Sequence, residues 1–389
     1  MAVSGGGDSV ALLHLLADWA RAGGPDLRVV TVDHGLRAEA AAEADGVAAQ
    51  CKALGMEHQT LRWQGWDGKG NLMDAARRAR MRLIAGWALA QGIGHVALGH
   101  TRDDQAETFL MRLARGSGVD GLAAMAHRRA ALGVVWERPL IDVRRDELRA
   151  FLIARRIRWV DDPTNEDATF DRIKARRALA VLEPLGITQD RIADTVFLMS
   201  MARKVLQGAI GRLADAHARD VAGSVMVEKR ALVMEPVETQ LRFLAEAIRW
   251  VSSSEYRPRL DALMDVHAAV VLQRKRTLSG CILTSDSTHV RIVREPKAVA
   301  SVVSPPDQLW DNRWRVDGPA EPGLEVRALS AEGLRACKDW RATGISRDAL
   351  FVSPAIWRGD TLVAAPIAGL PNGWTARIDA GFTSFIISH

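Results

Sequence analysis

The sequence predicts an α/β protein that begins with a parallel, doubly wound sheet. A helical and mixed middle domain and a small β-rich C-terminal domain are expected to follow. Up to residue 120, short apolar runs alternate with amphipathic helical stretches, which is typical of a parallel sheet covered on both faces. After residue 130 this alternation stops. The last residues, 307–389, contain short apolar runs separated by many turns.

The first domain is expected to span residues 1–185. Its predicted strands are 27–32 and 95–99, which are short, apolar and bounded by turn residues. The predicted helices have apolar residues at helical spacing and cover residues 10–21, 37–54, 72–91 and 103–115. Ligands of parallel sheets bind at the carboxyl ends of the strands, so chemistry is expected at the residues that follow them.

The chain changes character after this alternation. Residues 134–140 predict a strand, residues 161–165 a turn, and the predicted helices are 144–156, 170–182 and 188–219. A middle domain, 186–300, is expected to combine β-like runs at 224–234 and 277–293 with helices at 237–251 and 259–272. Residues 301–306 predict a linker before the C-terminal domain, 307–389.

Composition limits the class of protein. The chain has 389 residues, 48% hydrophobic and 25% charged, as in ordinary globular proteins. No apolar run approaches the roughly 20 residues that span a bilayer, and no secretory signal begins the chain, so a cytoplasmic protein is expected. The three cysteines form no CxxC pair, which gives a zinc or redox site little support. The net charge of +5 suits a nucleic-acid partner and an ordinary basic surface equally.

A glycine-rich loop lies between the first strand and the first helix. It consists of Ser4, Gly5, Gly6, Gly7, Asp8 and Ser9. Glycines let successive amides point into one concavity, and a helix amino terminus favours an anion. Asp8 repels phosphate, so it is expected to hold Mg²⁺ or to cap the helix. The loop lacks the lysine of a P-loop and predicts a pyrophosphate site, the alternative being a simple turn.

The strand before this loop is short. Only Met1–Val3 precede Ser4, whereas strands usually have about 5–6 residues. We therefore expect either a start assigned too late or a clipped first strand. Both would loosen the loop.

Asp104 and Glu107 are the strongest candidates for acid–base chemistry. They are three positions apart in a predicted helix that follows a strand, so they share one face of it. Two carboxylates at the end of a strand can bind Mg²⁺, hold an ammonium group or accept its proton. The alternative is a solvated helix face, with acids that favour the helix dipole.

Basic residues recur at helical spacing. Arg77 and Arg80 present two guanidinium groups from one helix, and Arg172 and Arg176 do so from another. Such pairs suit phosphates, although an exposed basic helix explains them as well. In the tail, the segments 310–314 and 354–360 interleave basic and aromatic residues, as single-stranded RNA surfaces do. Chance accounts for this interleaving equally, because the chain has 12 tryptophans.

These motifs resemble a known family. SGGGDS at Ser4–Ser9 resembles the SGGxDS signature of the PP-loop ATP pyrophosphatases, which implies an adenine nucleotide alpha hydrolase-like sheet. VDHGLR at 32–37 and GHTRDDQAET at 99–108 are similar to segments of the tRNA(Ile)-lysidine synthetases. The chain departs from that family at Met81, where tyrosine is usual, and at Ile173, where asparagine is usual.

The resemblance implies a reaction. ATP, with Mg²⁺, adenylates O2 of the cytidine at the first anticodon position of a tRNA(Ile) with anticodon CAU. The ε-amine of free L-lysine then attacks C2 and AMP leaves. No membrane and no protein partner are implied. The alternatives are another PP-loop tRNA-modifying enzyme, such as a thiolase, and a catalytically dead tRNA-binding protein.

The resemblance also implies roles for residues. Asp104 and Glu107 would place lysine or accept its proton, and Arg77 and His100 would stabilise charge on the α-phosphate. Asp33 and His34 would lie beside the nucleoside of ATP, and Asp8 would hold the metal. The residues expected to contact tRNA are Arg80, Arg112, Arg115, Arg172, Lys174 and Arg176.

Overall fold

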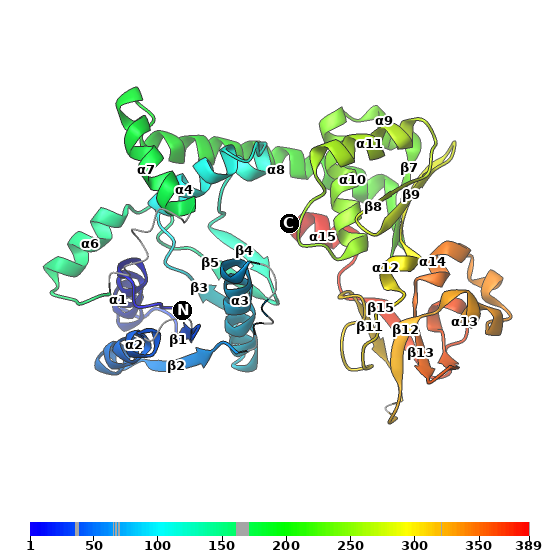
Figure 1. The fold of residues 1–389 in the computed structure, drawn as a ribbon, viewed down its shortest axis with the longest axis horizontal. Helices are drawn as coiled ribbons and strands as arrows, with labels where there is room; N and C mark the ends of the chain where they lie inside the picture. Colours follow the sequence, from blue (N-terminus) through cyan, green and yellow to red (C-terminus); the bar gives the residue numbers. More distant parts are fainter. Residues whose placement is uncertain are drawn as a thin grey trace. The chain divides into compact units, whose positions relative to one another are not determined.

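The structure, a computed structural model, describes the whole chain except residues 36–38, 65, 67, 69–70, 161–170, 320 and 389. The chain forms two compact units, Met1–Lys204 and Val205–His389, which are treated separately below (Figure 1). Helix α8 (Gln189–His217) contains the point of division. The expected division into residues 1–185, 186–300 and 307–389 stays a prediction.

The sheet of the first unit is parallel except at one edge. Its strands are β1 (Arg28–Asp33), β2 (Glu57–Arg62), β3 (His95–Ala97), β4 (Arg128–Ala131) and β5 (Val134–Glu137). β1 pairs with β2 and β3 with β5 in parallel, whereas β4 is antiparallel to β5. The predicted parallel sheet is therefore confirmed. Strands β2 and β4 were not predicted.

Residues 1–3 join the two halves of this sheet. Ala2 forms parallel bridges to Val30 of β1 and to Leu98, which directly follows β3. The Ala2 amide donates to the Ala97 carbonyl at 3.0 Å, and the Val3 amide donates to the Val30 carbonyl at 2.9 Å. The strand is as short as expected. Hydrogen bonds on both sides hold the residues that lead into the loop, and the expectation of a loosened loop stays a prediction.

Helices cover both faces of the sheet (Figure 1). On one face, α1 (Gly7–Arg21) and α2 (Ala40–Leu54) contribute Leu13 and Val47 to a core with Met1 and Val29. On the other, α3 (Leu72–Ala90) packs its apolar side, including Ile84, on β3 and β5. The predicted doubly wound arrangement is confirmed.

The remaining helices of this unit build out from the sheet. They are α4 (Arg102–Leu113), α5 (Val119–Leu122), α6 (Arg145–Ala154), α7 (Asp171–Leu182) and the 3-10 turn η2 (Glu183–Leu185). α6 packs Leu148 and Leu152 against Leu12 of α1. α4 shares a core of Phe109, Leu179 and Ile192 with α7 and α8. Apolar packing thus fixes α4 and α6, which follow β3 and β5.

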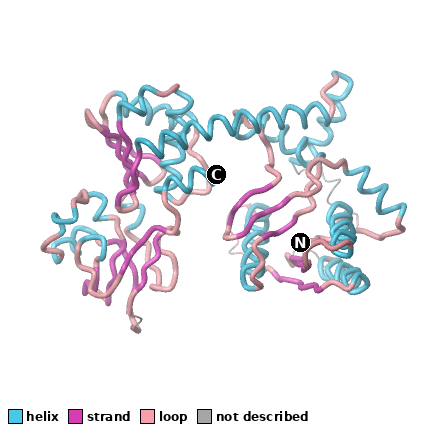
Figure 2. Tube along the Cα trace, turned by 180° about the vertical axis from the view of Figure 1, so that it is seen from behind, coloured by secondary structure: helices cyan, strands magenta, loops and turns pink. Residues whose placement is uncertain are grey.

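The second unit starts with an antiparallel sheet (Figure 2). Its strands run in the order β6 (Ala218–Val221), β7 (Ser224–Glu228), β10 (His289–Arg294), β9 (Cys281–Ser285) and β8 (Arg276–Leu278). The helices beside it are α9 (Lys229–Met234), α10 (Val237–Ser252), α11 (Leu260–Val271) and α12 (Pro296–Val299). The strand expected over 224–234 is wrong after Glu228, because residues 229–234 form α9.

The C-terminal part of this unit is β-rich, as predicted. Its strands are β11 (Trp314–Asp317), β12 (Glu325–Ala328), β13 (Pro354–Arg358), β14 (Thr361–Ala364) and β15 (Thr375–Ile378). Its helices and 3-10 turns are α13 (Ser330–Ala336), η3 (Trp340–Thr343), α14 (Arg347–Phe351), η4 (Pro366–Ala368) and α15 (Phe382–Ser388). Among the described residues, no helix is both long and apolar enough to cross a membrane.

The tryptophans of the tail are core residues. Trp310, Trp314 and Trp357 are 0%, 2% and 5% exposed. Buried rings cannot stack on RNA bases, so the suggestion of an aromatic RNA surface at these three residues is wrong. In β11, buried Trp314 and Val316 alternate with the more exposed Arg315 and Asp317, which explains the interleaving there.

Trp136 of β5 tests the packing of the first unit. It is fully buried, and its Nε1 donates to the Ala131 carbonyl at 3.0 Å. Trp136→Ala should lower the free energy of unfolding by about 3–5 kcal/mol, because it leaves a cavity in the core. Urea denaturation followed by circular dichroism measures this. Trp19→Ala is the control, since Trp19 is 55% exposed, and an equal loss in both variants would contradict the prediction.

Candidate functional site

The glycine-rich loop forms a cradle at the amino end of α1. Gly5 has φ +91°, a conformation that favours glycine, and Gly6 precedes the helix without a side-chain cap. The hydroxyl of Ser9 donates to the Gly6 carbonyl at 2.8 Å and lies 3.2 Å from the hydroxyl of Ser4. The first amides of α1 and the helix dipole therefore face the loop, which suits a phosphate.

Gly99 lets the next strand end approach this loop. A Cβ at Gly99 would lie 3.0 Å from Cα of Ser9 and 3.1 Å from the Asp8 carbonyl oxygen. These are backbone atoms, so they cannot move aside cheaply. A glycine after β3 is thus required for the loop and the start of α4 to share one site.

A capping box fixes Asp104 at the start of α4. Oδ2 of Asp104 accepts from the Thr101 amide at 2.9 Å and from the Thr101 hydroxyl at 3.1 Å. The Thr101 hydroxyl in turn accepts from the Asp104 amide at 3.4 Å. One carboxylate oxygen therefore starts the helix, while Oδ1 is left for the site.

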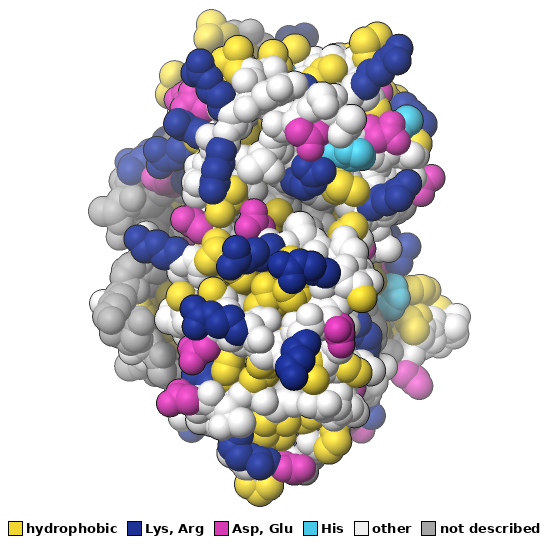
Figure 3. Space-filling model, turned by 90° about the vertical axis from the view of Figure 1, so that its right-hand side faces the viewer, with side chains coloured by type: hydrophobic (Ala, Val, Ile, Leu, Met, Phe, Trp, Pro, Cys, Tyr) yellow, Lys and Arg dark blue, Asp and Glu magenta, His cyan; other side chains and the backbone are white. Residues whose placement is uncertain are grey.

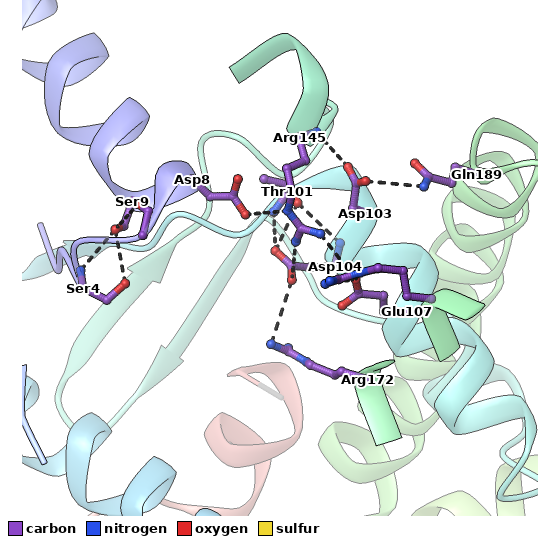
Figure 4. A network of polar contacts seen from close by, with 12 residues as sticks. Ser4, Asp8, Ser9, Thr101, Asp103, Asp104, Glu107, Arg145, Arg172 and Gln189 are labelled. Atoms are coloured by element: carbon purple, nitrogen blue, oxygen red, sulfur yellow. Dashed lines mark hydrogen bonds and ion pairs between the residues drawn. The ribbon is translucent and has the colours of Figure 1, made fainter. Parts of the chain in front are cut away.

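Arg145 brings the predicted acids together (Figure 4). Its Nε donates to Oδ2 of Asp8 at 2.9 Å. Its Nη2 and Nη1 lie 3.4 Å from Oδ1 of Asp104 and Oε1 of Glu107. The backbone amide of Arg145 also donates to Asp103 at 2.8 Å. The prediction that Asp104 and Glu107 share a face of one helix is confirmed, and Asp8 lies across Arg145 from them.

Two further arginines reach these carboxylates from α7. Arg176 donates twice to Oε1 of Glu107, at 2.8 and 3.0 Å, and Arg172 lies 3.9 Å from Oδ1 of Asp104. Glu107 is 1% exposed, yet its Oε2 is buried without a hydrogen-bond partner in the described structure. A buried, unpaired carboxylate oxygen is costly, so this atom is an open position for a donor or cation.

Burial and ion pairing shift the pKa values of Asp8 and Asp104 in opposite directions. Burial raises the pKa of Asp8, and Arg145 opposes this only in part. Burial also disfavours ionised Asp104, but Arg172, Arg145 and the Thr101 amide outweigh it and hold its pKa below the ordinary value. Asp104 is therefore a carboxylate at neutral pH.

A basic cluster of Arg80, Arg138 and Arg172 acts on His100, which also interacts with Asp104. Burial lowers the pKa of Arg80 and of Arg138 to about 10, and neighbouring arginines add to the effect. Each of these two side chains has a buried Nε without a hydrogen-bond partner in the described part of the chain. Buried like charges of this kind favour an anionic ligand.

His100 lies within this cluster as a neutral ring. Burial and the charges of Arg138, Arg172 and Arg80 lower its pKa to about 4, although Asp104 opposes them. Its Nδ1 is buried without a partner among the described residues. The expected stabilisation of phosphate charge by His100 therefore reduces to hydrogen bonding. Arg77, on the same helix as Arg80, is exposed, and its role at the α-phosphate stays a prediction.

Asp33 and His34 lie where β1 ends. Oδ1 of Asp33 accepts from the Gly35 amide at 2.8 Å, which starts a turn. Burial and Arg80 lower the pKa of His34, whose ring lies edge-on to Trp63. The two residues lie at a carboxyl strand end, and their place beside a nucleoside stays a prediction.

The other predicted RNA contacts have protein partners. Arg112 donates to the carbonyls of Gly121 and Ala124 at 2.9 and 3.0 Å, so it ties α5 to α4. Arg115 and Lys174 both pair with Asp171, at 3.0 and 3.5 Å. Arg176 is held by Glu107. The motif residues at 36–37 and the turn at 161–165 lie outside the described residues.

Arg145 and Arg138 were missed by the sequence analysis. Arg145 lies in a stretch with many basic residues, and its partners are up to 137 positions away. The signal available was its position at the start of a helix that follows a strand. Arg138 likewise follows β5 directly.

No metal site is complete on its own. Among the described residues, no group of three or more His, Cys, Asp or Glu side chains is placed to hold a metal ion. Mg²⁺ usually binds one or two carboxylates together with substrate phosphates and water. Asp8, beside a phosphate cradle, fits such a mixed site.

Comparison with known proteins decides the family. A PP-loop domain family matches residues 1–182. A tRNA(Ile)-lysidine synthase from Ruegeria pomeroyi is 48% identical over the whole chain and 94% of that protein. Enzymes of the same name from Wolbachia pipientis and Brucella anthropi are 34% and 33% identical, over 81% and 93% of the chain and 75% and 84% of those proteins.

The chain belongs to the tRNA(Ile)-lysidine synthase family. The family predicted from the sequence is therefore confirmed, as is its PP-loop fold. In this family member, the loop, the Asp104–Glu107 pair and the basic cluster meet at the carboxyl edge of one sheet. Figure 3 shows a face of the second unit, on which basic side chains are spread with acidic ones between them.

Gly99→Ala tests the phosphate cradle. The added methyl group meets backbone atoms of the loop, so the dissociation constant for ATP should rise about tenfold or more. Isothermal titration calorimetry measures it. Gly94→Ala is the matched control, because a Cβ there meets nothing within 4 Å. Equal ATP affinity in the two variants would refute the role of Gly99.

The low pKa of His100 predicts how the stability of the protein depends on pH. Its folded pKa of about 4 lies below the ordinary value of 6.5, so the unfolded chain binds more protons between these values. This residue's contribution to stability should be full above pH 6.5 and lost as the pH falls toward 4. Nuclear magnetic resonance of labelled histidine should show a neutral ring at pH 5.5. A ring that titrates near 6.5 would contradict it.

Proposed function

We propose that this chain uses ATP to attach L-lysine to C2 of the cytidine at the first anticodon position of a tRNA(Ile) with anticodon CAU. The cytidine O2 attacks the α-phosphorus and pyrophosphate leaves. The lysine ε-nitrogen then forms a bond to C2, the C2–O bond breaks, and AMP carries away that oxygen. One proton leaves the amine. The proposal joins the family to the geometry of the site.

The glycine-rich loop supports the nucleotide half. Its amides, Ser4 and Ser9 suit the β- and γ-phosphates, which become pyrophosphate. Asp33 and His34 border the neighbouring strand end and suit the nucleoside. Asp8 is the proposed ligand of Mg²⁺, which when bound offsets phosphate charge.

The open oxygen of Glu107 is the observation that carries the amine half. Oε2 of Glu107 is buried and unpartnered in the described structure, and Oδ1 of Asp104 is held only by long arginine contacts. An ammonium group is a compact donor with three hydrogens, which suits two acceptors of this kind. These acceptors, one helical turn apart, support a position for the lysine ε-nitrogen between the two acids.

The charges around this position favour attack. Free lysine has a pKa of about 10.4 and must lose a proton before its nitrogen can form a bond. Arg145, Arg172 and Arg176 surround the carboxylates and disfavour a further positive charge, which helps release the proton. Asp104, which is ionised at neutral pH, is the proposed acceptor; its lowered pKa makes it a weak base, so it passes the proton on to water.

The basic cluster supports the RNA half. Among the described residues, Nε of Arg80, Nε of Arg138 and Nδ1 of His100 are buried without a hydrogen-bond partner. The adenylated cytidine brings a phosphodiester and an α-phosphate to this region. Donors that exist before the reaction stabilise charge that develops during it. Arg77 extends the same cluster.

The cysteines weigh against a sulfur transferase. Cys51, Cys281 and Cys337 are all buried and unpaired. Burial raises the pKa of the Cys51 thiol to about 11 and that of Cys281 to about 12, so neither is a ready thiolate. A catalytically dead RNA-binding protein would not require the buried acid cluster, whose desolvation is costly.

Glu107→Gln tests this function in a reaction with ATP, labelled lysine and a tRNA(Ile) CAU transcript. The variant keeps the shape but loses the charge that holds the ammonium group. Its kcat/KM for lysine should fall about 100-fold, while ATP affinity stays unchanged. Asp104→Asn should fall similarly. Asp146→Asn, an exposed acid at the start of α6, is the control and should keep wild-type activity.

A methionine-identity transcript completes the test. It should accept no lysine. If wild-type protein labels neither tRNA, or if Asp104→Asn and Glu107→Gln both retain full lysine incorporation, the proposed function is refuted.

A further inference from the structure

Arg145 occupies the acids that both substrates need. One guanidinium group contacts Asp8 of the nucleotide loop and the Asp104–Glu107 pair of the proposed amine site (Figure 4). The side chain is 16% exposed. Its shortest contact, 2.9 Å, is to Asp8, and both contacts to the amine site are 3.4 Å.

The position of Arg145 is fixed by its helix. It begins α6, where its backbone amide donates to Asp103, and α6 packs on α1 through Leu148 and Leu152. The guanidinium end can turn while the backbone stays in place. A change of partner by Arg145 therefore requires side-chain rotation only.

Each acid of the cluster is paired with at least one arginine. Asp8, Asp104 and Glu107 are opposed by Arg145, Arg172 and Arg176. A lysine ammonium group would bring an additional positive charge beside Arg145 and compete with it for Asp104 and Glu107. Without nucleotide, lysine should therefore bind weakly.

We propose that Arg145 couples the two half-sites, so that nucleotide binding draws its guanidinium group away from Asp104 and Glu107 and opens them to the ammonium group of lysine. This inference rests on the proposed function, because it takes lysine as the amine. The ATP phosphates are polyanionic, lie beside Asp8 and attract the guanidinium group. The affinity for one substrate then depends on the other. Arg145 is a positioning residue in this role.

The test measures lysine binding by calorimetry, with and without a non-hydrolysable ATP analogue and Mg²⁺. In the wild-type protein, the analogue should strengthen lysine binding about fivefold or more. Arg145→Met removes the competing charge and keeps much of the side-chain length. This variant should bind lysine without nucleotide more tightly than wild type, and the analogue should change its affinity less than twofold.

Two further variants separate coupling from structural support. Arg144→Met is the matched control, because Arg144 is exposed, adjacent in sequence and paired with Asp190 instead. It should couple as wild type does. Arg145→Lys keeps the charge but not the fork of donors, so it should restore part of the coupling. Circular dichroism of each variant checks that it folds.

The outcomes distinguish the two proposals. If wild-type protein binds the analogue but no lysine under either condition, the proposed function fails and the coupling fails with it. If wild-type protein binds lysine equally with and without the analogue, only the coupling is overturned. Weaker lysine binding by folded Arg145→Met without nucleotide would also overturn it, because that result indicates simple support of the site.

Discussion

The site depends on one constraint, that buried charges must be paired. Asp8, Asp104 and Glu107 come from two helices that follow different strands, and their mutual repulsion would separate them. Arg145 makes their proximity tolerable with a single guanidinium group, and it can do so because α6 packs firmly on α1. Apolar packing thus sets the distance across which the acids cooperate, and the capping box of α4 sets the direction of Asp104.

The sequence predicted those elements of the fold in which apolar residues recur at regular spacing next to candidate site residues. The strand before Asp33 and the helix that carries Asp104 and Glu107 follow from apolar spacing, and the glycine-rich loop follows from its residues. Strand β2 could not be predicted in this way, because Glu57–Arg62 is an edge strand of mostly polar residues with little burial. Residues 229–234 favoured a strand by composition, yet they form a helix beside the sheet. Local preference yields to tertiary packing in both places.

The candidate site divides in the same manner. Helical spacing showed that the two acids share a face, and the resemblance to the family gave them a role. Arg145 was not, since an ion pair between distant segments leaves no periodic signal. The basic residues show the converse difficulty. Arg112 and Arg176 are of the residue type that contacts phosphates. However, Arg112 donates to backbone carbonyl oxygens and Arg176 pairs with Glu107. The tryptophans of the tail likewise pack inside, so aromatic content alone did not indicate a binding surface.

The place of residues 1–3 has a consequence for how the first unit folds. These residues form the middle of the sheet, between segments that begin 28 and 95 positions along the chain. During synthesis they emerge before both of their neighbours, and the second neighbour appears only after β1 and β2 have been made. Pairing over such a separation is slow. The loop that holds the nucleotide should therefore be among the last parts of the first unit to become ordered, and a ribosome-bound fragment that ends before β3 should lack it.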